Sequence, residues 1–292
     1  MPSHENHHFA PVFLLKQWET QPDEKLSCFF RINGRIVHQR YKAKSVAKEA
    51  GLYSLEGVSE SERNKIERDF MGPIIDEPAA DAHRAILTVG VRGLTDDQKL
   101  AWARFLVSLM VRTPDMVESL RTKGREKLLS DLNESPDEYA NVRGGEPAET
   151  LVDWAYQNIP HVFDNFGITV LPQVVDSELL NTGVLRGNWA SIPVSGCRHN
   201  LLIGDRPLIY VGKMSSRYVI ALPVSPVRLF VAVDSMETWR RAQAESANDI
   251  IRKANLDSVS KAARYVYSTG LAQQNFIERH LRSSLSSDSA SR

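Results

Sequence analysis

The residues Leu26–Tyr41, LSCFFRINGRIVHQRY, decide how this chain folds. Two runs of alternating apolar and polar residues flank the dipeptide Asn33-Gly34, and both residues of this dipeptide tolerate the positive φ of a two-residue hairpin turn. The pattern predicts a β-hairpin in which Phe30 lies opposite Val37. Since side chains alternate between the two faces of a strand, we expect Phe30 and Val37 to face the core. The same register pairs Leu26 with Tyr41, Cys28 with Gln39, and Ile32 with Arg35.

The opposite face of the hairpin is expected to point outward. It carries Phe29, Arg31, His38 and Arg40. The surrounding segment 25–48 holds seven basic residues and no acidic one, and a basic surface with exposed aromatic rings suits a phosphate backbone. The candidate nucleic-acid-binding residues of this segment are Arg31, Arg40 and Lys42. The alternative is an ordinary edge hairpin that its positive charge protects against aggregation.

The composition is that of a soluble globular protein. The 292 residues include 36 basic and 36 acidic side chains, so a preference for nucleic acid must come from local clustering. Only Cys28 and Cys197 are cysteines, which excludes a disulfide framework and a cysteine-rich zinc site. The sequence shows neither a signal peptide nor an apolar stretch long enough to cross a bilayer. We therefore expect a cytoplasmic protein without a membrane partner.

Helical patterns dominate the middle of the chain, and strands return near its end. Residues 59–62 and 95–98 have the spacing of capping boxes and predict two helix starts. Gly72-Pro73 is expected to interrupt the first helical stretch, because proline lacks the N–H donor of a helix interior. Alternating apolar residues between 189 and 233 predict short antiparallel strands, and the helical pattern resumes at Met236.

This order of elements predicts an α+β fold. We expect the N-terminal hairpin and the late antiparallel strands to form one sheet, with a large helical block and C-terminal helices around it. Residues 1–282 would make a single domain, because no linker-like segment divides them. The serine-rich residues 283–292 would form a disordered tail.

The chain opens on an unusual run, NHHFAPVFLLKQW, at residues 6–18. This run resembles the start of a bacterial family, the domain of unknown function 4238 family, which opens on a His-His-aromatic-x-Pro pattern. The family's His, Pro, Leu, basic and Phe positions are occupied by His8, Pro11, Leu15, Lys16 and Trp18. The family label names no activity, so the resemblance indicates where the site lies without naming its chemistry.

Further short matches to the family follow in the same order along the chain. Ile66-Glu67 is similar to the start of its helical part, and Arg112-Thr113-Pro114 is similar to a helix junction. Asp205-Arg206-Pro207 falls where the family has a turn between two strands. At that turn Gly204 stands in place of a hydroxyl residue, and Arg206 stands in place of Asn.

The candidate catalytic residues are His7, His8, Asp205 and Arg206. Adjacent residues of a strand point to opposite faces, so His7 and His8 would share a divalent metal only in a turn. Such a metal would need further ligands from Asp205, Glu67 or His199, although a lone helical Glu usually faces solvent. Both main candidates also have structural alternatives. His8 would pin the N-terminal segment through a backbone carbonyl, and Asp205 would bond its own turn.

Three functions remain open. The first is a hydrolase acting on a phosphodiester, in which His8 is the general acid or base and Asp205 orients it or binds a metal. Arg206 and Arg112 would stabilise the anion. The second is a non-catalytic nucleic-acid-binding or partner-sensing module that uses the basic hairpin, and the third is an interaction protein whose motifs are folding devices. We expect His8 and Asp205 to satisfy each other, because a buried polar group needs a partner.

Overall fold

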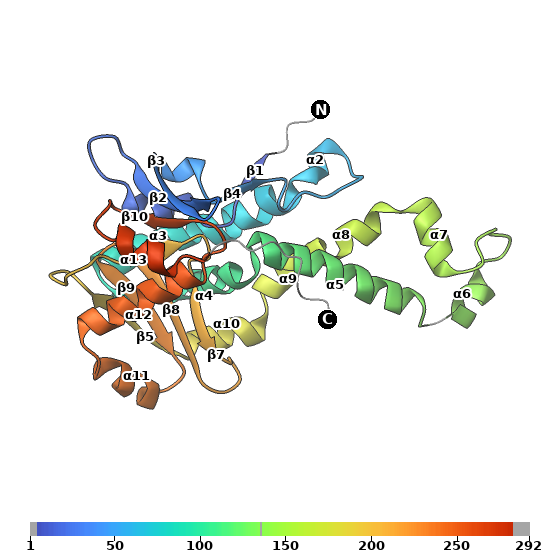
Figure 1. Cartoon of the computed structure of the whole chain (residues 1–292). Helices are drawn as coiled ribbons and strands as arrows, with labels where there is room; N and C mark the ends of the chain where they lie inside the picture. The colour runs from blue at the N-terminus through green and yellow to red at the C-terminus, as the bar shows by residue number, and fades with distance from the viewer. Residues whose placement is uncertain (1–4, 135, 283–292) are drawn as a thin grey trace.

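The computed structural model of the chain describes residues 5–134 and 136–282 (Figure 1). The strands are β1 (Asn6–His8), β2 (Leu26–Ile32), β3 (Arg35–Tyr41), β4 (Lys48–Ala50), β5 (Asn188–Pro193), β6 (Ile203–Gly204), β7 (Ile209–Gly212), β8 (Tyr218–Ser225), β9 (Arg228–Val233) and β10 (Val266–Ser268). The serine-rich residues 283–292, expected to form a tail, lie outside the described residues.

The α-helices are α1 (Val12–Leu15), α2 (Glu60–Arg63), α3 (Glu77–Thr88), α4 (Asp96–Val111), α5 (Pro114–Leu132), α6 (Pro136–Val142), α7 (Leu151–Asn158), α8 (His161–Thr169), α9 (Leu171–Val175), α10 (Glu178–Leu185), α11 (Met236–Gln243), α12 (Ala247–Ser260) and α13 (Gln274–His280). A π-helix, η3 (Glu67–Asp76), precedes α3, and short 3-10 turns lie at η1 (Lys16–Trp18), η2 (Ala43–Ser45) and η4 (Val91–Gly93). This mixture confirms the predicted α+β class.

The hairpin forms as predicted. β2 and β3 pair with Phe30 opposite Val37. Asn33 and Gly34 have φ values of 48° and 78°, the left-handed conformation that a two-residue turn requires. The alternating pattern therefore defined both the strands and their register.

The hairpin and the late strands do not all share one sheet, so that part of the prediction is wrong. β2 pairs with β10, which in turn pairs with β6, in the order β3-β2-β10-β6. The longer late strands form a separate sheet in the order β5-β9-β8-β7, and β1 pairs with β4 alone. Alternation identifies strands but not the edges that pair. Here β7, β8 and β9 are joined by short connections and pair with their neighbours in sequence.

Both faces of the hairpin are covered. Phe30 lies in the main core with Val37 packed against it, as predicted. Phe29 is fully buried as well, in a second cluster that includes Val259 of α12 and Ile277 of α13. The prediction that Phe29 faces outward is therefore wrong, because the C-terminal helices cover the second face.

The helix that contains Gly72-Pro73 is not interrupted. It continues as the π-helix η3 and leads directly into α3. In an α-helix the ring of Pro73 would clash with the carbonyl group of Asp69, four residues earlier, whereas the i→i+5 pattern avoids that contact. The expected break is therefore wrong, and a wider helical turn takes its place.

Helix α4 carries the chain into the interior. Its capping box is formed as predicted, with Thr95 Oγ1 accepting from the N–H of Gln98 at 3.2 Å and Gln98 Oε1 accepting from the N–H of Thr95 at 3.1 Å. The side chain of Ser59, the other predicted cap, donates to the Glu62 carboxylate instead. From α4 the chain enters α5, which extends with α6, α7 and α8 as an arm away from the sheets (Figure 1). No helix within the described residues has the length and apolar character needed to cross a bilayer.

Candidate functional site

Arg112 lies at the C-terminal end of α4, and its side chain is completely buried. Its Nη1 donates to Asp76 Oδ1 at 2.7 Å, and its Nη2 donates to Asp76 Oδ2 at 3.0 Å. Nη2 also donates to the backbone carbonyl of His8 at 2.8 Å. One guanidinium therefore joins β1, the end of the π-helix and the end of α4, three segments that lie far apart in sequence.

Tyr53 connects His7 to the backbone of Arg112. The backbone N–H of Tyr53 donates to His7 Nδ1 at 3.0 Å, and its hydroxyl donates to the carbonyl oxygen of Arg112 at 3.0 Å. The two rings stack, with centroids 5.5 Å apart and planes 3° from parallel. Because Nδ1 accepts a hydrogen bond, the neutral imidazole carries its proton on Nε2. That buried Nε2 has no partner among the described residues.

Glu67 is the first residue of the π-helix, and its Oε2 is likewise buried without a partner among the described residues. Burial raises the pKa of Glu67 to about 7, against the opposing charge of Arg112 and with the help of Asp76 and Glu5. Burial also lowers the pKa of His7. Near neutral pH the imidazole of His7 is therefore neutral, whereas the carboxyl group of Glu67 is still protonated in a fraction of the molecules. General acid–base catalysis uses this combination.

The geometry of the π-helix explains why Glu67 and Asp76 both reach Arg112. Nine positions in an α-helix make about 2.5 turns, so the two residues would point in opposite directions. In the π-helix both carboxyl groups lie close enough to Arg112 to influence, or respond to, its charge. Burial is the largest single influence on Arg112 and lowers its pKa, but Asp76 and Tyr53 together raise the pKa by more, so the guanidinium stays charged.

His8 lies at the edge of the cluster and is partly exposed. Its Nε2 is 3.3 Å from the carbonyl oxygen of Lys44, so the predicted bond to a backbone carbonyl is present. On β4, Lys48 lies directly opposite His8. Burial lowers the pKa of His8, the Lys44 carbonyl raises it, and the charges of Lys48 and Arg112 lower it further. An Nε2 that donates to Lys44 leaves Nδ1 as the basic nitrogen of the neutral ring.

We call the group Arg112, Asp76, Tyr53, His7, His8 and Glu67 the Arg112 cluster. A cleft of about 700 Å³ is formed by segments that adjoin this cluster in sequence. It is lined by residues 49–52, which directly follow Lys48 of β4, and by the first turns of α5, which follow Arg112. Arg121 and Arg125 are the basic residues of this lining.

Asp205 is placed elsewhere. It is 3% exposed, and its carboxylate accepts hydrogen bonds from the backbone N–H groups of three consecutive residues at 2.7 to 2.9 Å. The donors are Ala263, Arg264 and Tyr265. Burial raises the pKa of Asp205 although these donors lower it. Within the described residues no hydrogen bond joins His8 to Asp205, so the expected direct pairing is wrong. The loop before β10 satisfies the carboxylate instead.

Arg206 lies on the outer side of the α4–α5 junction. Its Nη2 is 2.9 Å from Asp115 Oδ2, in the first turn of α5, and both side chains are more than 40% exposed. The Asp205-Arg206-Pro207 turn therefore contacts the chain three residues after Arg112, but Arg206 makes no hydrogen bond to the described residues of the Arg112 cluster.

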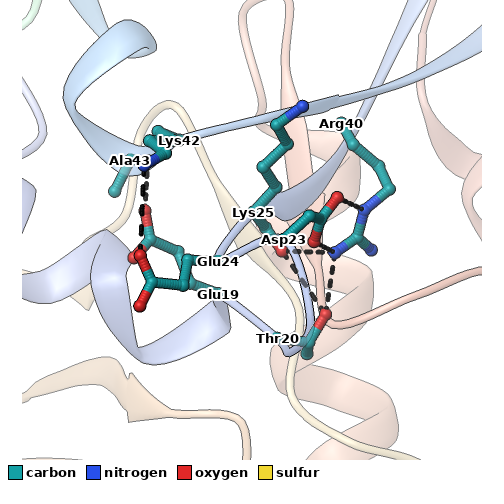
Figure 2. A network of polar contacts seen from close by, with 8 residues as sticks. All are labelled: Glu19, Thr20, Asp23, Glu24, Lys25, Arg40, Lys42 and Ala43. Atoms are coloured by element: carbon teal, nitrogen blue, oxygen red, sulfur yellow. Dashed lines mark hydrogen bonds and ion pairs between the residues drawn. The ribbon is translucent and has the colours of Figure 1, made fainter.

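Two of the candidate nucleic-acid-binding residues of the hairpin have internal partners. Arg31 donates through Nη1 to the carbonyl of Gly34 at 2.6 Å and through Nε to the carbonyl of Leu281 at 2.8 Å. Arg40 binds both carboxylate oxygens of Asp23, at 2.9 and 2.5 Å, as Figure 2 shows. Its Nη2 also lies within 3 Å of Thr20 Oγ1 and of the Lys25 carbonyl oxygen.

Lys42 differs from these two arginines. Its side chain is 48% exposed, and its nearest acidic partner, Glu24, is 3.9 Å away. The expectation of a free basic face therefore holds for Lys42 and is wrong for Arg31 and Arg40. The alternating pattern of a strand does not reveal such acceptors. The end of α13 supplies one for Arg31, and the turn before β2 supplies those for Arg40.

Sequence reasoning missed Tyr53 and Asp76 and expected Glu67 to face solvent. The proline inside a helical pattern was the available signal for Asp76, because it marks a helix that cannot remain a regular α-helix. Nothing in the local sequence of Tyr53 indicates its contacts with both His7 and Arg112. Within the described ranges no group of three or more His, Cys, Asp or Glu side chains is arranged to hold a metal ion.

The chain belongs to the family described as "Protein of unknown function (DUF4238)", whose model matches residues 6–270. This match confirms the resemblance noted in the sequence. Neither a curated protein nor a solved structure matches the chain. Of the segments that carry the resemblance, those containing His8, Glu67 and Arg112 meet in the Arg112 cluster, whereas Asp205 has partners of its own.

Removing the buried cation should be strongly destabilising. We expect Arg112→Ala to lower the free energy of unfolding by about 3–5 kcal/mol, because it leaves Asp76 and the His8 carbonyl without their donor. Urea denaturation measures the difference. Arg104→Ala is the matched control, since Arg104 pairs with Asp176 at the surface and should contribute less than about 1 kcal/mol. Equal losses for both variants would contradict the central role of Arg112.

Glu67 should make the stability depend on pH. Its folded pKa of about 7 lies above its ordinary value of 4.5, so the folded state retains a proton that the unfolded state has lost. This contribution is fully present below about pH 4.5 and disappears as the pH rises through about 7. The melting temperature of the wild type should therefore fall relative to that of Glu67→Gln between pH 5 and pH 8. Glu126→Gln, at an exposed position of α5, should follow the wild type at every pH.

Arg40 should support the hairpin, whereas Lys42 should not. We expect Arg40→Ala to cost about 1–2 kcal/mol of unfolding free energy, because Asp23 and the Lys25 carbonyl lose a charged donor. Lys42→Ala removes an exposed charge only two positions away and should change stability by less than about 0.5 kcal/mol. Chemical denaturation measures both variants. An unchanged free energy of unfolding in Arg40→Ala would show that the network in Figure 2 does not stabilise the hairpin.

Proposed function

We propose that the protein is a hydrolase for phosphodiesters and that its acid–base groups are His8 and Glu67. The observation that carries the proposal is the convergence of three distant segments around Arg112, with titratable groups whose pKa values are shifted in opposite directions, that of Glu67 upward to about 7 and that of His8 downward. Groups shifted in this way concentrate at catalytic sites. π-helices are also frequent at functional sites, and Glu67 begins one.

His8 is the general base of the proposed reaction. With Nε2 directed at the Lys44 carbonyl, its Nδ1 takes a proton from a water molecule, and the water oxygen attacks phosphorus. Glu67 in its protonated form gives a proton to the leaving oxygen as the phosphorus–oxygen bond of the ester breaks. Both residues lie close enough to the Arg112–Asp76 pair for its charges to shift their pKa values.

Four further residues have supporting roles in the proposed chemistry. His7 is completely buried, so it would act as a positioning residue through its bond to Tyr53 and would not touch the substrate. The backbone of Lys44 contacts the His8 ring and Lys48 lies opposite His8 on β4, and both lysines would attract the anionic substrate. Arg112 is a positioning residue, because its donors already hold Asp76 and His8. The proposal replaces Asp205 with Glu67, since the carboxylate of Asp205 is bound by its own loop.

The alternative function is a non-catalytic nucleic-acid-binding module. The exposed side chains of Lys42 and Lys44 favour it, since both belong to the basic segment and neither is fully paired. In either case we propose a cytoplasmic location, because both cysteines are free and the cytosol keeps thiols reduced.

Hydrolysis of bis(p-nitrophenyl) phosphate tests the proposal, measured across the neutral pH range with and without added Mg²⁺ or Mn²⁺. His8→Ala and Glu67→Gln should each lower the rate by about 10²–10⁴-fold, the contribution of one acid–base group. His199→Ala changes an exposed histidine outside the Arg112 cluster and should leave the rate unchanged. Melting temperatures of all variants separate loss of chemistry from loss of folding.

Two results would overturn the proposed hydrolase function. If His8→Ala hydrolyses bis(p-nitrophenyl) phosphate at the wild-type rate, His8 is not the general base. Absence of hydrolysis by the wild type, together with salt-sensitive binding of a single-stranded oligonucleotide that Lys42→Glu weakens, would favour the binding module.

A further inference from the structure

The β5-β9-β8-β7 sheet has two apolar faces. Phe230 and Leu222 point into the main core. Their neighbours Leu229 and Val231, together with Ala221, belong to a separate cluster on the opposite face. This outer face needs a cover of its own, because an exposed apolar sheet would be a liability for a soluble domain.

The cover over the outer face is incomplete. Helix α12 packs on it, with Ile251 and Ala254 buried against the strands. Helix α11 also lies beside this sheet (Figure 1), but none of its eight described residues is fully buried. Met236 of α11 is 50% exposed although it is apolar. The two helices therefore leave a space between themselves and the sheet.

That space is a cavity of about 440 Å³. All four strands contribute to its wall, chiefly through Ile192, Val211, Val219, Leu229 and Val231, and α12 contributes Ile250. The walls are mainly branched aliphatic side chains. A second cavity, of about 740 Å³, shares Ile192, Ala242, Glu245 and Ile250 with the first and extends toward Trp189 and Trp239. Cavities of this size and composition are typical of small-molecule sites.

The charged residues at the rim neutralise one another. Arg241 binds Glu237 at 2.6 Å, Lys253 binds Glu245 at 2.6 Å, and Lys261 binds Asp257 at 2.6 Å. No cation is therefore left over among these described residues to hold an anionic headgroup inside the cavity. The lining and the rim together favour an uncharged ligand.

The two terminal segments of the sequence that lie outside the described residues do not match the chemistry of this cavity. Residues 1–4 are MPSH, and residues 283–292 are SSLSSDSASR. Both sequences are mainly polar and would lose hydration in an aliphatic cavity without gaining partners. Neither segment therefore matches the lining of the cavity, which favours an apolar ligand.

We propose that this cavity binds an uncharged aliphatic chain, such as that of a long-chain alcohol or a neutral lipid. The ligand would lie between the outer face of the sheet and α11, and it would complete the apolar cover that α11 leaves open. The site is independent of the Arg112 cluster, since the two share no residue.

Fluorescence of the neutral probe N-phenyl-1-naphthylamine with the full chain tests this proposal. The wild type should enhance the fluorescence, and 1-dodecanol should displace the probe. Val211→Asp introduces a carboxylate at a cavity wall position that is 54% exposed, so folding tolerates it. It should weaken probe binding by at least about tenfold, because a carboxylate in an apolar site must be desolvated. Val142→Asp, at a position 79% exposed on α6, is the matched control and should bind as the wild type does.

Three outcomes would overturn the proposal. In the first, the wild type does not enhance the fluorescence at all. In the second, Val211→Asp and Val142→Asp bind the probe equally well, which would place the probe elsewhere. Displacement by dodecanoate at lower concentration than by 1-dodecanol would show that the site selects an anion. A retained melting temperature in Val211→Asp confirms that lost binding reflects the cavity and not unfolding.

Discussion

One buried cation organises the part of the molecule where the candidate site lies. Arg112 is fully buried, and a guanidinium without acceptors in the interior would cost several kcal/mol. Its acceptors come from Asp76 and from the backbone of His8. The end of α4, the π-helix and β1 must therefore keep one mutual arrangement. A buried ion pair adds little net stability compared with apolar packing, so its main effect here is to define where these segments meet.

The same constraint produces the chemistry of the site. Glu67 and His7 are carried into the interior with the segments that Arg112 joins, and burial shifts the pKa of one upward and of the other downward. His8, on the outer side of β1, keeps contact with solvent and with Lys48. A carboxyl group with a raised pKa, a neutral imidazole and a neighbouring lysine thus arise from one packing arrangement, whereas the aliphatic cavity beside α11 and α12 belongs to a different sheet.

Much of the local structure follows from the sequence by simple rules. The Asn33-Gly34 turn needs two residues that accept positive φ, and the capping box of α4 needs Thr95 and Gln98 three positions apart. Both form as predicted, because each depends only on residues close in sequence. The predicted break at Gly72-Pro73 does not occur, since proline excludes an α-helical bond without excluding the wider π-helix.

The sequence by itself determined the α+β class, the hairpin with its register, and the candidates His7, His8 and Arg112. Only the tertiary structure decided that Phe29 is buried, that Asp205 accepts hydrogen bonds from the loop before β10, and that Glu67 lies near Arg112. These outcomes depend on which distant segment covers a face or supplies a hydrogen bond. Alternation and capping act over a few residues, whereas burial and pKa shifts depend on every element packed around a group.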